Sequence, residues 1–207
     1  MLTFYYAPGS CALASHIALE QSGAEYRAVR VDFSRTEQRS ADYLQVNPKG
    51  RVPALATGRG VLTENPAILA YVAQTHPAAR LAPLDDPFEF ARMQSFNSYL
   101  CATVHVAFAH RGRAYRWADD PAAIAAMQQK VPQNVAECFD LIEREMLAGP
   151  WVMGAACTVA DAYLYTVARW LEGAGVDPAR FPRVLDHRQR MAEMPAVRKV
   201  VDEEGRR

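Results

Sequence analysis

The sequence predicts a small α/β domain followed by an all-helical domain. Three observations carry this prediction. Short apolar runs alternate with helical patterns in residues 1–75, in the order βαβ and then ββα. A proline-rich stretch follows at residues 76–87, and every pattern after it has helical spacing. We therefore expect domains at residues 1–77 and 88–207, joined by a linker at residues 78–87.

The α/β domain begins with a strand, a helix and a second strand. Leu2–Tyr6 is apolar and aromatic, and a Pro-Gly pair ends it, as expected of a strand followed by a turn. Apolar residues at helical spacing follow Cys11, and Gly23 is well placed to stop that helix. Tyr26–Phe33 alternates apolar and charged residues, which predicts a strand. The polar stretch Ser34–Gln45 carries at most a short helix.

A hairpin and a helix complete this domain. Val52–Thr57 and Val61–Thr63 are predicted as short strands around Gly58-Arg59-Gly60, whose glycines suit a hairpin. Asn65 is expected to cap the next helix, because its side chain can accept from the first free N–H groups. Pro66 suits the first helical position, where its missing N–H costs nothing.

The second domain reads as a series of helices. Thr158 and Asp161 form a capping-box pattern directly before an apolar run. Pro132 is expected to bend the helix in which it lies. The expected helices cover Phe88–Trp117, Pro121–Leu147, Ala162–Leu171, Phe181–Ala192 and Pro195–Val201.

Composition excludes several classes of function. The formal net charge is zero and the charges are interspersed, which disfavours binding to nucleic acid or to an anionic membrane. No apolar stretch approaches the roughly 20 residues of a spanning helix, and no secretory signal opens the chain. Four cysteines without regular spacing favour neither a disulfide scaffold nor a zinc site. We expect a soluble cytoplasmic protein without a metal.

One cysteine is placed differently from the other three. Cys11 lies at the start of the helix that follows the first strand and its turn. The positive end of a helix favours the thiolate. Cys101, Cys138 and Cys157 lie within apolar helical patterns, where a buried and inert thiol is usual. Cys11 is therefore the candidate for chemistry.

Four segments together resemble bacterial beta-class glutathione S-transferases. They are residues 5–17, 46–55, 62–68 and 158–164, and they span both predicted domains in the order and spacing of that family. The resemblance implies a thioredoxin-like N-terminal domain that binds glutathione. It also implies a helical domain that carries the second-substrate site, and a homodimer.

The resemblance implies a glutathione site in the first domain. Pro53 would follow a cis bond, leaving the main chain of Val52 to pair with the peptide like an added strand. At Glu64-Asn65, a carboxylate would meet the ligand ammonium while the N–H groups of the helix start hold its carboxylate, although simple capping explains both residues equally well. Lys49 would lie near a glutathione carboxylate, or is a surface charge. The implied binding residues are Ser10, Lys49, Val52, Pro53, Glu64 and Asn65.

The implied catalytic residues are Cys11 and His105. Cys11 would lie beside the sulfur of glutathione, either to activate it or to form a mixed disulfide with it. His105 matches a histidine above the thiol site, whereas its apolar helix alone favours a packed core residue. Val106 stands where the family often has lysine, so a cation near the thiolate is missing. Either Arg111, Arg113 or Arg116 compensates for it, or these arginines form a solvated helix face.

The function implied is conjugation of the glutathione thiolate to a small electrophile. The second substrate would lie near His105, Phe108, Tyr115 and Trp117. A monothiol reductase that reduces disulfides or peroxides through Cys11 is the alternative. A third interpretation is a binding protein that keeps the site without the activity.

Overall fold

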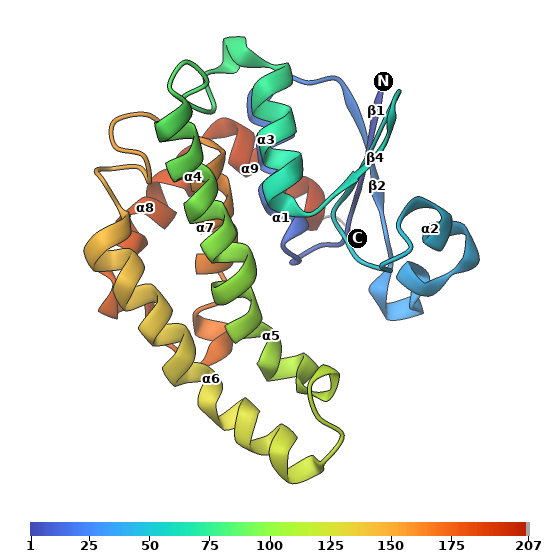
Figure 1. The fold of residues 1–207 in the computed structure, drawn as a ribbon, viewed down its shortest axis with the longest axis vertical. Helices are drawn as coiled ribbons and strands as arrows, with labels where there is room; N and C mark the ends of the chain where they lie inside the picture. The colour runs from blue at the N-terminus through green and yellow to red at the C-terminus, as the bar shows by residue number, and fades with distance from the viewer. Residues whose placement is uncertain (206–207) are drawn as a thin grey trace.

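The computed structural model describes residues 1–205 and contains a mixed four-stranded sheet in its N-terminal part (Figure 1). The strand order is β2-β1-β3-β4, with β1 and β2 parallel and both other pairs antiparallel. This topology confirms the predicted thioredoxin-like domain. The strands are β1 (Leu2–Tyr6), β2 (Tyr26–Arg30), β3 (Ala54–Thr57) and β4 (Gly60–Thr63).

Helices cover the sheet and build the second domain. In Figure 1, α1 and α3 lie between the sheet and the helical domain, while α2 lies at the far edge of the N-terminal domain. The order confirms the predicted α/β and all-helical classes. The helices are α1 (Ala12–Ser22), α2 (Ala41–Val46), α3 (Asn65–Thr75), α4 (Pro87–Tyr99), α5 (His105–Arg113), α6 (Pro121–Leu141), α7 (Val159–Ala168), α8 (Pro182–Glu193) and α9 (Pro195–Gly205). Within residues 1–205, no helix is long and apolar enough to cross a membrane.

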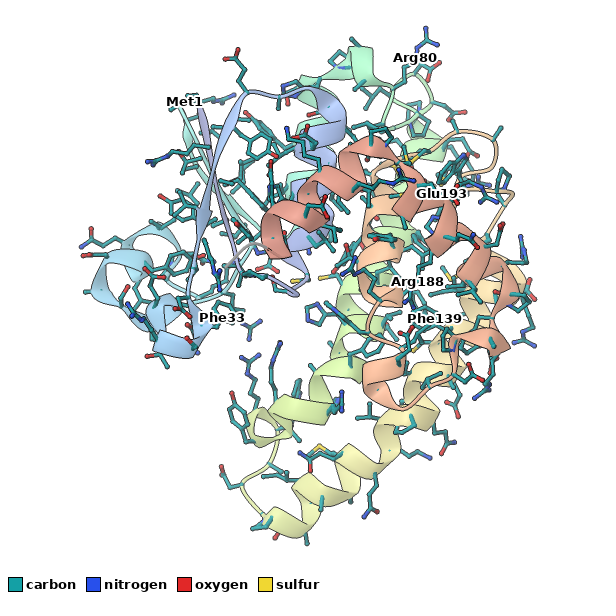
Figure 2. All side chains as sticks on the ribbon, turned by 180° about the vertical axis from the view of Figure 1, so that it is seen from behind. Met1, Phe33, Arg80, Phe139, Arg188 and Glu193 are labelled. Atoms are coloured by element: carbon teal, nitrogen blue, oxygen red, sulfur yellow. The ribbon has the colours of Figure 1, made fainter. Side chains whose placement is uncertain are left out.

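Two predicted strands are too long. The strand predicted to reach Phe33 stops at Arg30, because the Asp32 carboxylate accepts from Ser34 N at 2.9 Å and starts a 3₁₀ turn. Phe33 lies in that turn at the edge of the domain (Figure 2) and is 42% exposed. The strand predicted from Val52 begins only at Ala54, the residue that first pairs with β1.

The long helical patterns each contain a π-helical segment. Residues Leu100–Val104 form a π turn that joins α4 to α5, so that His105 directly follows an irregularity in the helix. Such bulges occur frequently at functional sites. Ile142–Met146 extends α6 in the same way. Pro132 lies inside α6 and does not end it.

The predicted capping box starts the most deeply buried helix. The Thr158 side chain accepts from Ala160 N, and the Asp161 carboxylate accepts from Thr158 N at 2.7 Å. Every residue of α7 is buried. The prediction of this cap is confirmed, although α7 ends at Ala168 instead of Leu171.

The last helix is tied to the first by a buried pair. His16 Nδ1 of α1 lies 2.9 Å from Glu204 Oε1 of α9, and the His16 ring packs among Phe4, Tyr6 and Tyr26. The His16 side chain is fully buried and that of Glu204 nearly so. These contacts give His16 a structural role.

The three cysteines expected to be inert differ in their surroundings. Cys138 is buried in α6, whereas Cys101 and Cys157 are only partly buried. Cys157 lies in the loop before Thr158 and not in a helix, so that part of the prediction is wrong. Burial raises the pKa of all three thiols, which keeps them in the neutral form.

Candidate active site

Cys11 lies at the first turn of α1, facing the loop that precedes β3. Its Sγ is 3.7 Å from the carbonyl oxygen of Val52, to which the thiol donates. The hydroxyl of the neighbouring Ser10 donates to Ala7 O at 2.6 Å and accepts from Ala12 N at 3.2 Å. Ser10 therefore stabilises the turn that presents Cys11.

The loop before β3 is held by side chains of α2 and its surroundings. Tyr43 Oη and Asn47 Nδ2 both donate to Arg51 O, at 2.8 and 2.6 Å. The bond between Val52 and Pro53 is cis, as the family resemblance implied. Gly50 has a φ of +59°, and a Cβ there would come within 2.9 Å of Gln38 O, so only glycine fits. These contacts fix the main chain of Val52 beside Cys11.

Asn65 is not the cap of α3 that the sequence predicted. The cap position belongs to Glu64, and Asn65 is the first helical residue. The buried Asn65 side chain turns toward α1 instead, where its Nδ2 donates to Cys11 O at 2.8 Å and its Oδ1 accepts from Ser15 Oγ at 2.6 Å. The amide is better satisfied by these buried partners than by a solvent-facing cap. Asn65 therefore ties the start of α3 to the start of α1.

Glu64 and Lys49 form an exposed ion pair beside this junction. Lys49 Nζ pairs with Glu64 Oε1 and also donates to Thr63 Oγ1 at 2.7 Å. About half of each charged side chain is exposed, so a bound ligand can reach both. The backbone of Glu64 has a φ of +73°, which is uncommon for a residue other than glycine.

Trp170, which the sequence analysis missed, links the two domains at this site. It follows α7, and its Nε1 donates to Gly9 O at 3.3 Å, in the turn before Cys11. The Trp170 ring lies edge-on to His105 at 5.2 Å and to Phe108 at 5.4 Å between centroids. No local pattern marks this tryptophan, because its partners lie far away in the sequence.

Comparison with known proteins settles the family. A model of the glutathione S-transferase N-terminal domain matches residues 1–74, and one of the C-terminal domain matches residues 121–190. Glutathione S-transferase GstA of Escherichia coli O157:H7 is 33% identical over 207 residues, with 99% of each chain covered. The chain belongs to the glutathione S-transferase family. Glutathione is the co-substrate of this transferase, and the resemblance found in the sequence is confirmed at this level.

Solved structures agree with this transferase over nearly its whole length. A glutathione transferase homologue from Sulfitobacter with bound glutathione is 44% identical, with a TM-score of 0.94 and 98% of each chain covered. A bacterial beta-class glutathione S-transferase of Sphingomonas chungbukensis is 34% identical, with a TM-score of 0.85 and 98% of each chain covered.

The thiol of Cys11 in this transferase is neutral. The residue keeps some solvent exposure, but protein surrounds the sulfur closely. This burial raises the pKa of Cys11 to about 12, and the charge of Arg113 only partly opposes it. The expectation of a thiolate is therefore wrong. Loss of water around the sulfur outweighs the partial charge of the helix end.

His105 is neutral as well. Burial is the largest of the causes that lower the pKa of His105 to about 4, and the charges of Arg113, Arg51 and Arg116 contribute to the same shift. Within residues 1–205, no hydrogen bond joins the ring to Cys11. A neutral imidazole can donate or accept a hydrogen bond with a ligand, but it supplies no positive charge.

The pKa of His105 predicts acid-sensitive stability. Between pH 6.5 and pH 4 the unfolded chain binds a proton at this ring and the folded protein does not, so the free energy of unfolding falls as pH falls through this window. Below pH 4 both states bind it and the loss stops. The slope stays below one proton, because a single ring titrates and the titrations of the folded and unfolded states overlap. Urea unfolding at pH 7, 5.5 and 4.5 should show a smaller decrease for His105→Gln than for wild type; equal decreases would contradict the pKa shift.

The aromatic residues proposed for the second substrate do not all face the site. Phe108 packs on Trp170, next to His105. Trp117 packs on His110 instead, at 4.2 Å between centroids. His110 is five residues after His105, so it points to another side of the helix. Tyr115 is 62% exposed at the end of this segment.

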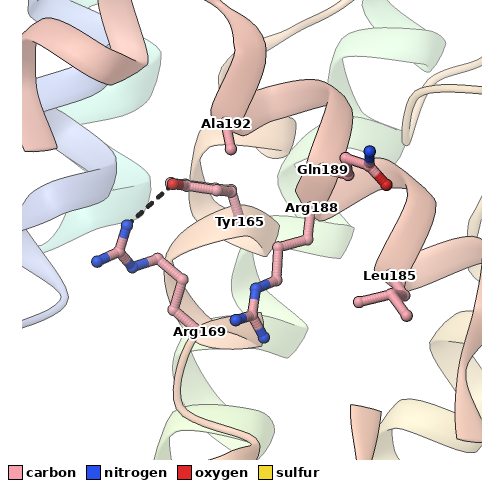
Figure 3. A pocket seen from close by; sticks show the side chains of 6 residues that line it. All are labelled: Tyr165, Arg169, Leu185, Arg188, Gln189 and Ala192. Carbon is pink, nitrogen blue, oxygen red and sulfur yellow. Dashed lines mark hydrogen bonds between the residues drawn. The ribbon is translucent and has the colours of Figure 1, made fainter. Parts of the chain in front are cut away.

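The predicted residues lie apart from a surface groove between α7 and α8 (Figure 3). This groove has a volume of about 390 Å³, and Arg169 donates to Tyr165 Oη along one wall. Its lining residues are Tyr165, Arg169, Leu185, Arg188, Gln189 and Ala192. In the described chain, no three potential metal-ligating side chains cluster together.

Proposed function

We propose that this glutathione transferase joins the thiolate of glutathione to the electrophilic carbon of a small apolar substrate. One observation carries the proposal: the starts of α1 and α3 and the loop before β3 converge on Cys11. Trp170 of the helical domain reaches Gly9 in the turn before Cys11, and His105 packs against Trp170. Peptide-binding and aromatic groups thus meet at a single place.

Glutathione would lie along the N-terminal domain. The main chain of Val52 pairs with the peptide backbone, since the loop around it is fixed by Tyr43 and Asn47. The carboxylate of Glu64 takes the γ-glutamyl ammonium, and Lys49 takes a ligand carboxylate. Ser10 and Asn65 act through the backbone of the first turn of α1, because their side chains are engaged within the protein.

The chemical step is a substitution at carbon. Glutathione loses its thiol proton to solvent, the thiolate sulfur forms a bond to the electrophilic carbon, and the leaving group departs with the bonding electrons. Hydrogen bonds from His105 and the positive charge of Arg113 favour the thiolate of the bound peptide. Phe108 and Trp170 supply an apolar wall for the electrophile.

Replacing Cys11 with alanine separates this proposal from a reductase. Because the pKa of Cys11 is raised to about 12, its thiolate is scarce at pH 7.5. We expect Cys11→Ala to keep conjugation of 1-chloro-2,4-dinitrobenzene within about threefold of wild type. A loss of conjugation by a hundredfold would show that Cys11 activates glutathione.

The reductase alternative predicts that Cys11→Ala loses activity. Reduction of a glutathione mixed disulfide by wild type, abolished in Cys11→Ala, would assign the covalent role to Cys11. Calorimetry with glutathione serves as the control, since wild type and Cys11→Ala should both bind it. Wild type that binds no glutathione would contradict the proposed site.

We also place this transferase in the beta class, as a cytoplasmic homodimer acting in detoxification. The likeness to the beta-class structure of Sphingomonas chungbukensis supports the class. The domain limits we propose are residues 1–77 and 88–207, with the linker at residues 78–87. A 3₁₀ turn at Pro77–Ala79 and the start of α4 at Pro87 fit this division.

A further inference from the structure

Three arginines from the two domains lie close enough to His105 for their charges to lower its pKa. Arg51 comes directly before Val52, whose carbonyl oxygen lies 3.7 Å from the Cys11 sulfur. Arg113 ends α5 and Arg116 lies in the 3₁₀ turn that follows. All three are exposed.

The geometry of α5 turns one of these arginines toward the site. Arg113 is eight residues after His105, a little over two turns of the helix, so both side chains project from neighbouring sides. Figure 2 shows nitrogen-tipped side chains in the space between this end of the helix and the N-terminal domain.

The charges of these arginines are not neutralised locally. In residues 1–205, none of the three forms an ion pair with an acidic side chain. The charges of all three lower the pKa of His105, and the charge of Arg113 also lowers the pKa of Cys11. Glu64 opposes them at His105, but Lys49 pairs with Glu64. The protein carries no net charge, so this positive field is a local feature of the site.

We propose that Arg51, Arg113 and Arg116 select an electrophilic substrate that carries a carboxylate or another anionic group. The inference rests on the proposed conjugation reaction and names the class of its second substrate. The electrophilic carbon meets the glutathione sulfur beside Phe108 and Trp170. The anionic end of the substrate extends toward the three arginines, which bind carboxylates through paired N–H groups.

Two activated aryl halides test this selection. 1-Chloro-2,4-dinitrobenzene is neutral, and 4-chloro-3,5-dinitrobenzoate carries a carboxylate on a similar ring. The measurement is kcat/KM for each at saturating glutathione, divided by the uncatalysed rate of that halide with glutathione. We expect wild type to favour the benzoate, and the preference to shrink as ionic strength rises.

Substitutions assign the preference to the three arginines. Arg113→Gln and Arg116→Gln should each lower the preference by about threefold, the usual effect of one exposed charge. Arg51→Gln should do the same from the other domain. Arg111→Gln is the matched control on the same helix, because Arg111 is exposed and its guanidinium lies next to Gly173 of the helical domain. It should leave the preference unchanged.

Other outcomes separate the inference from the proposed function. The same arginines could hold a carboxylate of glutathione itself; the KM for glutathione would then rise in the three variants while the preference stayed constant, which would overturn the inference. Turnover of the neutral halide with no preference for the benzoate would also overturn it. No turnover of either halide by wild type would contradict the proposed function, and the inference with it.

Discussion

Replacing Asp161 with alanine is expected to lower the free energy of unfolding by about 3 kcal/mol or more, because each buried donor left without an acceptor costs about 1 to 3 kcal/mol. Asp161 is fully buried, and its carboxylate accepts from Val152 N at 2.8 Å and Thr158 N at 2.7 Å. It also lies 2.9 Å from Nε2 of the buried His187. Alanine would leave all these donors without an acceptor in the core.

Two variants calibrate this loss in equilibrium urea unfolding at constant protein concentration. Thr158→Ala removes the other half of the capping box and should cost about 0.5 to 2 kcal/mol. Asp140→Ala makes the same chemical change in an exposed pair with Arg180 and should cost at most about 1 kcal/mol. If Asp161→Ala costs no more than Thr158→Ala, then Asp161 acts only as a cap and the contacts with Val152 and His187 contribute nothing.

Features set by neighbouring residues were predictable from the sequence. The capping box of Thr158 and Asp161 needs only a spacing of three residues, and it was found correctly. β1 and α1 were also located correctly, because a Pro-Gly turn separates two clear hydrophobic periods. The family resemblance added the cis bond before Pro53, which spacing alone could not indicate.

Features set by distant residues were not predictable. Trp170 reaches Gly9, and His16 reaches Glu204, across most of the chain. Asn65 has the sequence position expected of a helix cap, but its side chain forms hydrogen bonds with Ser15 and with the backbone of Cys11 instead. These contacts exist only once both domains have packed.

The pKa of Cys11 also depends on distant residues and could not be predicted from the sequence. The helix start, visible in the sequence, favours a thiolate. The protein packed around the sulfur, which no local pattern reveals, favours the neutral thiol more strongly. A sequence can therefore locate a reactive group without giving the sign of its pKa shift.

Replacing Glu64 with glycine is expected to weaken glutathione binding without lowering stability. Glu64 has a φ of +73° and a ψ of 126°, a conformation that costs a non-glycine residue about 1 to 3 kcal/mol. Glycine adopts it freely but loses about 0.5 to 1 kcal/mol through its larger unfolded-state entropy. The exposed pair with Lys49 contributes little. The free energy of unfolding should therefore stay constant or rise by up to about 2.5 kcal/mol.

The same change should weaken glutathione binding about ten- to a hundredfold, because hydrogen bonds between charged groups contribute about 1.5 to 3 kcal/mol. Glu64→Gln is the matched control: it keeps the positive φ and loses the charge, so affinity should fall without any gain in stability. Urea unfolding and calorimetry measure the two quantities separately. If Glu64→Gly binds glutathione as wild type does, the carboxylate has no role in the site. If both variants lose affinity and only glycine is stabilised, the strained conformation of Glu64 is held for binding and not for the fold.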